Sequence, residues 1–155
     1  NKGKEKMPFS IGAHPAIALP DHFENYALQF EKEESLKYYL LENDLISSKT
    51  KILETKNNLV PLNYELFKND ALIFKTLESK SLTILNNSKP YIKVDYKDFP
   101  SLGIWTKENA PFICIEPWLG YSDTDENTGD LYHKEGILIL EANKDFSAKF
   151  SITTL

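Results

Sequence analysis

Two side chains suited to proton transfer stand directly before prolines in this sequence. Glu116 lies in the apolar stretch 111–120, PFICIEPWLG, and His14 lies in SIGAHPA. A residue before proline is kept out of the α region, so we expect both side chains to be held on extended backbone at strand ends. Glu116 as a carboxylate can accept a proton, and His14 as an imidazolium can donate one.

A base and an acid of this kind suit the opening of a cyclic hemiacetal. The base takes the proton of the anomeric hydroxyl while the acid protonates the ring oxygen, and each group supplies about 10²–10⁴-fold in rate. The reaction needs no metal, cofactor or covalent nucleophile. The alternative is structural: Glu116 would be a strand-end carboxylate bonded to a backbone N–H or a lysine, and His14 a loop imidazole bonded to a carbonyl.

The strand that carries Glu116 sets its surroundings. Side chains alternate along a strand, so Glu116 shares a face with Phe112 and Cys114. A carboxylate on an apolar face must be paired, hydrogen-bonded or lining a cavity. Pro117 lacks an N–H, so we expect strand pairing to stop there and the strand end to open toward a site. Trp118 follows as either a core residue or a platform for the C–H face of a sugar.

Other candidate residues carry weaker signals. Asp70 precedes an apolar run and is typical of a turn residue, and Trp105 could serve as core or as sugar platform. We expect His22 and His133 on the surface. The acidic cluster in 123–130 suggests calcium, but threonine and lysine stand where an EF-hand loop needs glycine and glutamate. We therefore expect a solvated loop and no metal site.

Composition excludes several classes of function. The chain has 155 residues, a net charge of −5 and no arginine among its 18 basic residues. This balance argues against nucleic acid and anionic membrane surfaces as partners and excludes capture of phosphate by a guanidinium. The single cysteine, Cys114, excludes an intrachain disulfide and favours packing in a reducing compartment, so we expect a cytoplasmic protein.

The hydrophobic pattern predicts about ten short strands with turns between them and hardly any helix. The fold class is therefore all-β, an antiparallel β-sandwich, with 1–155 as one domain. We expect a turn at 12–16, a helical turn at 63–68 capped by Asn63, and a long loop at 122–136 that is functional or mobile. The strands are expected at 7–12, 26–31, 36–43, 51–55, 71–77, 81–86, 91–96, 111–118, 137–142 and 146–155, with a short apolar piece at 58–62.

Four stretches resemble the aldose 1-epimerases, or galactose mutarotases, and in particular their bacterial lac-operon-associated branch. They are FSIGAHPAI at 9–17, NDALIF at 69–74, FPSLGIWTKENAPFICIEPWLG at 99–120 and HKEGILIL at 133–140. The resemblance implies a β-supersandwich that interconverts the α and β anomers of free aldoses. It implies that His14 protonates the ring oxygen, that Glu116 is the general base and that Asp70 binds sugar hydroxyls.

The family fold is about twice as long, so the chain resembles its C-terminal half. The sequence begins at Asn1 rather than at methionine, and we expect the N-terminal half of the same protein to be missing, leaving exposed strand edges and an unfinished cleft. Alternative functions are a hexose-6-phosphate 1-epimerase and a non-catalytic sugar-binding or sensing domain. A structural sandwich without a ligand is the remaining alternative, and the oligomeric state is not indicated.

Overall fold

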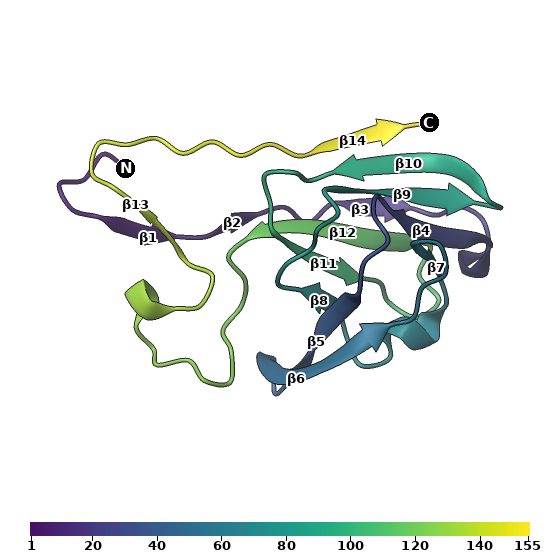
Figure 1. Ribbon diagram of the computed structural model, residues 1–155, viewed down its shortest axis with the longest axis horizontal. Helices are drawn as coiled ribbons and strands as arrows, with labels where there is room; N and C mark the ends of the chain where they lie inside the picture. Colours follow the sequence, from purple (N-terminus) through teal and green to yellow (C-terminus); the bar gives the residue numbers. More distant parts are fainter.

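Two antiparallel sheets face each other in the computed structural model, which describes residues 1–155 (Figure 1). The first sheet has five strands, in the order β14 (Ser151–Thr154), β10 (Lys89–Asp95), β9 (Ser81–Asn86), β4 (Tyr26–Phe30) and β7 (Leu59–Pro61). The second has seven, in the order β2 (Ile11–Gly12), β12 (Phe112–Leu119), β11 (Ser101–Trp105), β8 (Leu72–Phe74), β5 (Leu36–Glu42) and β6 (Leu45–Leu53), with β3 (Ala16–Ala18) also paired to β12.

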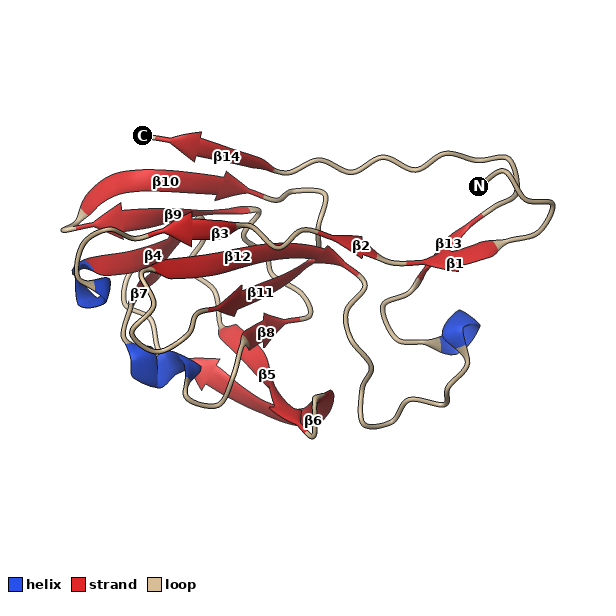
Figure 2. Cartoon of the chain, turned by 180° about the vertical axis from the view of Figure 1, so that it is seen from behind, coloured by secondary structure: helices blue, strands red, loops and turns tan.

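The remaining elements lie around these sheets. A ribbon of β1 (Met7–Phe9) and β13 (Leu138–Leu140) extends from one end of the sandwich, as both ribbon views show (Figures 1 and 2). Three short 3-10 helices are η1 (Phe23–Asn25), η2 (Tyr64–Phe67) and η3 (Leu131–His133). The all-β antiparallel prediction is confirmed. No helix has the length and hydrophobicity needed to span a bilayer.

The core lies between the two sheets and follows the alternation of the sequence. In β4, Tyr26, Leu28 and Phe30 are buried while Gln29 is exposed. Such residues from both sheets form one cluster of 25 buried side chains. Each large apolar side chain that is fully buried stabilises the fold by about 1.5–3 kcal/mol. This core therefore holds the second sheet in place, including the face that points away from the core.

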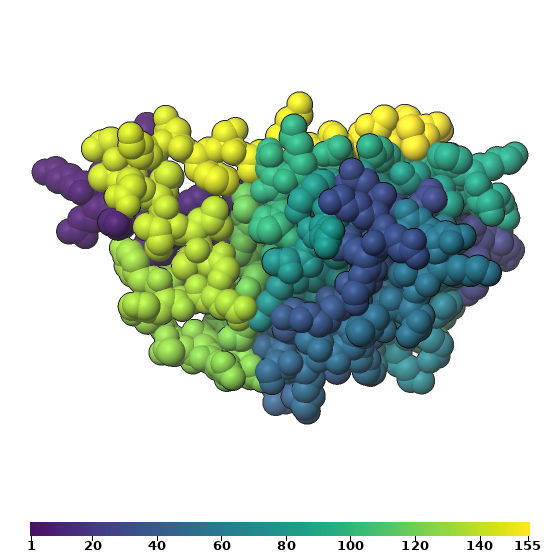
Figure 3. Space-filling view, viewed as in Figure 1, coloured from purple at the N-terminus to yellow at the C-terminus, as the bar shows by residue number.

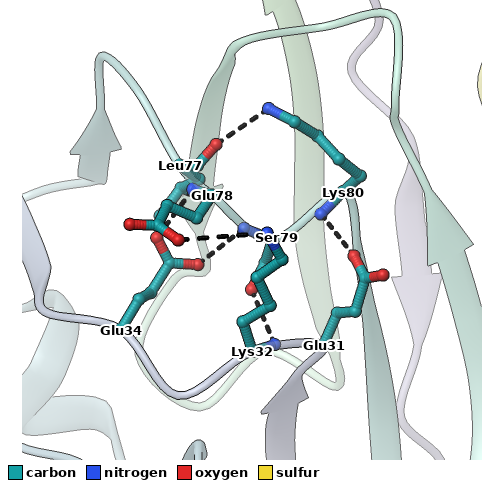
Figure 4. A network of polar contacts seen from close by, with 7 residues as sticks. All are labelled: Glu31, Lys32, Glu34, Leu77, Glu78, Ser79 and Lys80. Carbon is teal, nitrogen blue, oxygen red and sulfur yellow. Dashed lines mark hydrogen bonds and ion pairs between the residues drawn. The ribbon is translucent and has the colours of Figure 1, made fainter.

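A polar network holds the β4–β5 connection against the β8–β9 connection (Figure 4). The Glu34 carboxylate accepts hydrogen bonds from the backbone N–H of Glu78 at 2.7 Å and of Ser79 at 2.8 Å. Glu31 accepts from the Lys80 N–H at 2.7 Å, and the Ser79 hydroxyl accepts from the Lys32 N–H at 3.0 Å. Because β4 and β9 belong to one sheet and β5 and β8 to the other, these bonds fix the two sheets relative to each other.

The predicted cap at Asn63 is confirmed. Its side-chain oxygen accepts a hydrogen bond from the Leu66 N–H at 3.2 Å at the start of η2. This bond satisfies one of the N–H groups that a helix start leaves free.

Three local predictions are wrong. The segment 12–16 is not a turn: β2 and β3 on either side of it both pair with β12. The predicted strand at 146–155 is regular only over β14, and 142–150 runs without strand pairing. The predicted strand at 7–12 is divided between β1 and β2, which pair with different partners.

Pairing also does not stop at Pro117, since β12 continues to Leu119. Hydrogen bonding alternates between the two sides of a strand, and the Pro117 carbonyl accepts from the Ala13 N–H at 3.1 Å. The Pro117 nitrogen, which has no proton, therefore faces β2 and β3. On the opposite side the ladder to β11 continues to the pair Ser101 and Trp118.

Candidate active site

The register of β12 against β2 and β3 places His14 opposite Glu116. Trp118 is paired with Gly12, and Cys114 is paired with Ala16. Both pairings belong to one unbroken antiparallel register, so the residue facing Glu116 is His14. Two residues that are distant in the sequence are thus cross-strand neighbours.

The two prolines give this pair its geometry. Ala13 donates its N–H to the Pro117 carbonyl at 3.1 Å, and Ile115 donates to the Pro15 carbonyl at 3.3 Å. Neither proline has an N–H that could donate the second hydrogen bond of its pair. Each of these two flanking pairs therefore has one backbone hydrogen bond instead of the usual two. His14 and Glu116 lie between them as a non-hydrogen-bonded pair, the type in which side chains approach more closely.

The side chains of the pair are in contact. His14 Nδ1 lies 3.1 Å from Glu116 Oε2, and the side chains are 66% and 8% exposed respectively. Burial raises the pKa of the Glu116 carboxyl above its usual range, while the His14 ring and the Trp118 indole N–H act in the opposite direction. A buried carboxylate that contacts an exposed imidazole can accept a proton from a ligand in the cleft, while the imidazole remains free to move.

Trp118 lies flat on the sheet over two glycines. A Cβ at Gly12 would stand 2.8 Å from Trp118 Cδ1, and a Cβ at Gly103 would collide with the six-membered ring of the indole. Gly12 is on β2 and Gly103 on β11, so the indole reaches across β12 from one neighbouring strand toward the other. These glycines are required by close approach of the ring, and Trp118 is a half-buried platform beside Glu116.

Two adjoining cavities open at the pair. One, of about 360 Å³, is lined by residues that include Gly12, His14, Glu116, Trp118 and Tyr121. The other, of about 270 Å³, shares His14, Glu116 and Trp118 and adds Asp70 and Trp105. The four residues that the sequence singled out, His14, Asp70, Glu116 and Trp118, therefore border one cleft. Their roles there remain predictions.

Asp70 has a strained backbone at the edge of this cleft. Its φ is +77°, in the left-handed region that non-glycine residues rarely adopt. Its Oδ1 accepts a hydrogen bond from the Ala71 N–H at 2.6 Å. Asp70 is both the turn residue that its sequence suggests and a cleft residue, and strain of this kind is concentrated at functional sites.

Sequence reasoning missed a cluster beside the pair, formed by Lys75, Glu135, Tyr39 and Tyr121. Lys75 Nζ lies 2.9 Å and 2.7 Å from the two Glu135 oxygens, 4.4 Å from the centre of the Tyr39 ring and 5.2 Å from that of Tyr121. Lys75 and Tyr121 also lower the pKa of Glu135, and burial raises that of Tyr121. No local pattern indicates the cluster, because its members come from separate parts of the chain.

The long loop 122–136 is held by contacts of Asp123 with the far end of the loop and with β6. Lys134 Nζ lies 2.7 Å from Asp123 Oδ1, and Ile46 on β6 donates its N–H to the Asp123 carbonyl at 2.9 Å. Figure 3 shows this yellow-green segment against the blue strands of the second sheet. Of this loop, only Ser122 lines the two cavities at the pair.

The other predicted residues lie away from the acid/base pair or beside it without a polar role. His22 and His133 are exposed, and His133 Nδ1 contacts Asp130 Oδ2 at 2.7 Å. Trp105 is half-buried and packs edge-on to His14 with the ring centres 6.4 Å apart. Cys114 is buried on the same strand face as Glu116, and burial raises its pKa to about 11.

A larger cavity, of about 590 Å³, lies near β7 and is lined by residues such as Gln29, Thr55 and Pro61. It holds no acid/base pair in contact. Volume alone thus does not identify the site, and the cleft at His14 and Glu116 is the better candidate because reactive groups converge there.

A solved structure with the same arrangement of strands reveals the relationship. A galactose mutarotase related enzyme from Lactobacillus acidophilus matches with a TM-score of 0.89 and 30% identity, over 100% of this chain and 54% of that one. The chain thus has the fold of the galactose mutarotase-like proteins and resembles one half of them. A galactose mutarotase-like protein from Lactobacillus casei matches with a TM-score of 0.80 and 26% identity, over 98% of this chain and 53% of that one.

Two curated relatives fit the lac-associated branch of the resemblance. The chromosomal and plasmid LacX proteins of Lactococcus lactis subsp. lactis are each 36% identical over 141 residues, covering 84% of this chain and 47% of LacX. The expected resemblance to the lac-associated branch is thereby confirmed. The chain spans about half the length of the relatives it matches. No protein-family model matches the sequence.

Proposed function

We propose that this chain supplies the acid/base pair of an aldose 1-epimerase that interconverts the anomers of a free monosaccharide. The observation that carries the proposal is the 3.1 Å contact between His14 Nδ1 and Glu116 Oε2 in a cleft bordered by the half-buried Trp118 indole. The anomeric hydroxyl oxygen and the ring oxygen of a pyranose are bonded to the same carbon. An acid and a base that serve these two oxygens must therefore be near neighbours, as His14 and Glu116 are.

The proposed reaction moves two protons and breaks one bond. Glu116 takes the proton of the anomeric hydroxyl while protonated His14 gives a proton to the ring oxygen, and the bond from the anomeric carbon to the ring oxygen breaks. The open-chain aldehyde rotates about its first carbon–carbon bond. Closure reverses both transfers: His14 recovers its proton from the attacking hydroxyl, and Glu116 returns its proton to the carbonyl oxygen.

The surrounding residues would hold the sugar for this step. Trp118 offers a flat face for the C–H side of a pyranose, and Asp70 offers carboxylate oxygens to hydroxyls at the edge of the cleft. Burial holds the Glu116 carboxylate in a poorly solvated position, which makes it a stronger base than a solvated one. These roles agree with what the motif resemblance implies for His14, Glu116 and Asp70.

A hexose-6-phosphate is the alternative substrate, and the cleft offers it little. The two cavities at the pair are lined by no lysine. The nearby Lys75 and Lys134 are engaged by Glu135 and Asp123 at 2.7 Å. A phosphate would need cationic ligands, and neither of these cavities supplies one from a lysine.

We further propose that residues 1–155 are one β-sandwich unit, which works together with a complementary half in the cytoplasm. The coverage of about half of each relative supports this, and the single buried cysteine is in keeping with a reducing compartment.

The experiment compares turnover with binding in a longer protein that carries this sequence. Anomer exchange and sugar affinity are measured by NMR for a free hexose and its 6-phosphate, in the wild type, in Glu116→Gln and in the exposed control Glu65→Gln. We expect exchange of the free hexose to be lost only in Glu116→Gln, with little change in its affinity. Binding without any exchange in the wild type would favour a sensing domain, and faster exchange of the 6-phosphate would favour the alternative substrate.

A further inference from the structure

The thiol of Cys114 lies beside the acid/base pair and has no part in the proposed proton transfer. Cys114 and Glu116 stand two residues apart on β12 and point to the same face, and His14 faces Glu116 from the neighbouring segment. A ring nitrogen of His14, Cys114 Sγ and a Glu116 oxygen all lie within 4.8 Å of one another. Cys114 is buried, with 1% of its surface exposed.

We propose that His14, Cys114 and Glu116 form a binding site for a thiophilic divalent cation, with Zn²⁺ as the best match. Sulfur, imidazole nitrogen and carboxylate oxygen are the three donor types that zinc takes in proteins, whereas Mg²⁺ and Ca²⁺ take oxygen. Three protein ligands leave the fourth tetrahedral position for water.

The distances fit after a small movement. With metal–ligand bonds of about 2.0–2.3 Å, ligands around a tetrahedral zinc lie about 3.3–3.7 Å apart. The upper limit of 4.8 Å in the structure thus requires a closure on the order of 1 Å. The His14 side chain is 66% exposed, so it can supply this movement without disturbing the core.

The charges also balance. Zinc binds the thiolate, so binding releases the thiol proton to solvent. A thiolate, a carboxylate and a neutral imidazole then compensate the two positive charges of the cation in a partly buried place. This balance matters because an unpaired charge is costly there.

A consequence for activity follows, and this part alone rests on the proposed function. The metal would occupy the two side chains that exchange protons with the sugar. Zinc and sugar should therefore compete, and zinc should inhibit anomer exchange. Metal binding itself can be tested on the 155-residue chain without any activity.

The test uses Co²⁺ as a spectroscopic probe and Zn²⁺ against a chromophoric chelator. We expect Co²⁺ to give a thiolate-to-metal charge-transfer band in the wild type, and Zn²⁺ to displace it. Cys114→Ala should abolish the band. His14→Gln changes an exposed side chain and should leave the fold intact, while weakening binding by at least the 10–100-fold that loss of an outer-shell partner typically costs.

The matched control is His133→Gln, which removes the exposed histidine that lies 2.7 Å from Asp130. It should bind as tightly as the wild type. The proposal is overturned if Co²⁺ binds without a thiolate band, if His14→Gln binds like the wild type, or if binding is lost in His133→Gln. Binding of Mg²⁺ with equal affinity would also contradict it.

Discussion

His14 and Glu116 face each other as a non-hydrogen-bonded cross-strand pair, between two hydrogen-bonded pairs that each lack one bond because of a proline. The prolines do more than hold the preceding residues extended. They also leave only one backbone hydrogen bond in the pair on each side of His14 and Glu116. This part of β12 lies opposite the gap between β2 and β3. The contact of 3.1 Å is thus a product of register and proline placement together.

The close contact between the Trp118 indole and Gly103 predicts that a side chain at position 103 will displace the ring. Gly103→Ala would place a methyl group into the indole, so we expect the ring to be displaced, the free energy of unfolding to fall by about 1–3 kcal/mol, and sugar affinity to fall with it. Tryptophan fluorescence, chemical denaturation and sugar titration measure these effects. Gly3→Ala is the control, since its nearest neighbour is the Asn1 side chain at 3.1 Å, far from the cleft. Unchanged fluorescence and affinity in Gly103→Ala would refute the platform.

The positive φ of Asp70 predicts that replacing it with glycine will keep or raise stability but weaken sugar binding. Glycine tolerates a φ of +77° without strain, so Asp70→Gly should be as stable as the wild type or more stable, and should bind sugar more weakly because the carboxylate is gone. The matched control is Asp44→Gly, at a turn with a φ of +65°. The control should keep the stability effect and leave sugar binding unchanged. Equal sugar affinity in Asp70→Gly and wild type would remove Asp70 from the site.

The Lys75–Glu135 pair predicts a stability difference that depends on pH. Lys75 lowers the pKa of Glu135 below its ordinary value in the folded state, so the pair stabilises the fold above the unfolded pKa, and this contribution is lost as pH falls through the folded pKa. Lys75→Met should therefore be less stable than the wild type near neutral pH, with a smaller difference in acid. Denaturation curves at several pH values measure it. A difference that grows as pH falls would contradict the assignment.

The half-length coverage of the relatives predicts that residues 1–155 alone are not a competent catalyst. Polarimetry of sugar mutarotation can compare this chain with a longer protein that contains it. We expect the rate with the 155-residue chain to equal the buffer rate, although sugar can still perturb the NMR signals of Trp118 and His14. Full activity of the short chain would show that the cleft is complete without the other half.

Local pattern predicted the parts of the fold that depend on local burial. The alternation in β4 and β10 matches their buried faces because each packs one side on the core. The Asn63 cap also followed from short-range chemistry. Local pattern does not indicate the pairing of β2 and β3 with β12, because this pairing joins segments that are distant in the sequence. Local pattern therefore predicts a turn at 12–16 where the structure has none.

The same distinction holds for the cleft. His14 and Glu116 could be singled out because each carries its own proline, and the resemblance added Asp70. Lys75, Tyr121 and Glu135 meet only in the folded chain. The alternation that placed Cys114 on the face of Glu116 was visible in the sequence, but its distance from the His14 ring was not.

A double-mutant cycle on anomer exchange tests the central claim most directly. In a longer protein carrying this sequence, the exchange rate is measured for the wild type, His14→Gln, Glu116→Gln and the double variant. If the two side chains act on one bond system, each single variant should lose about 10²–10⁴-fold, and the double variant little more than the worse single one. Single variants that exchange anomers at the wild-type rate, or losses that multiply independently in the double variant, would contradict the account.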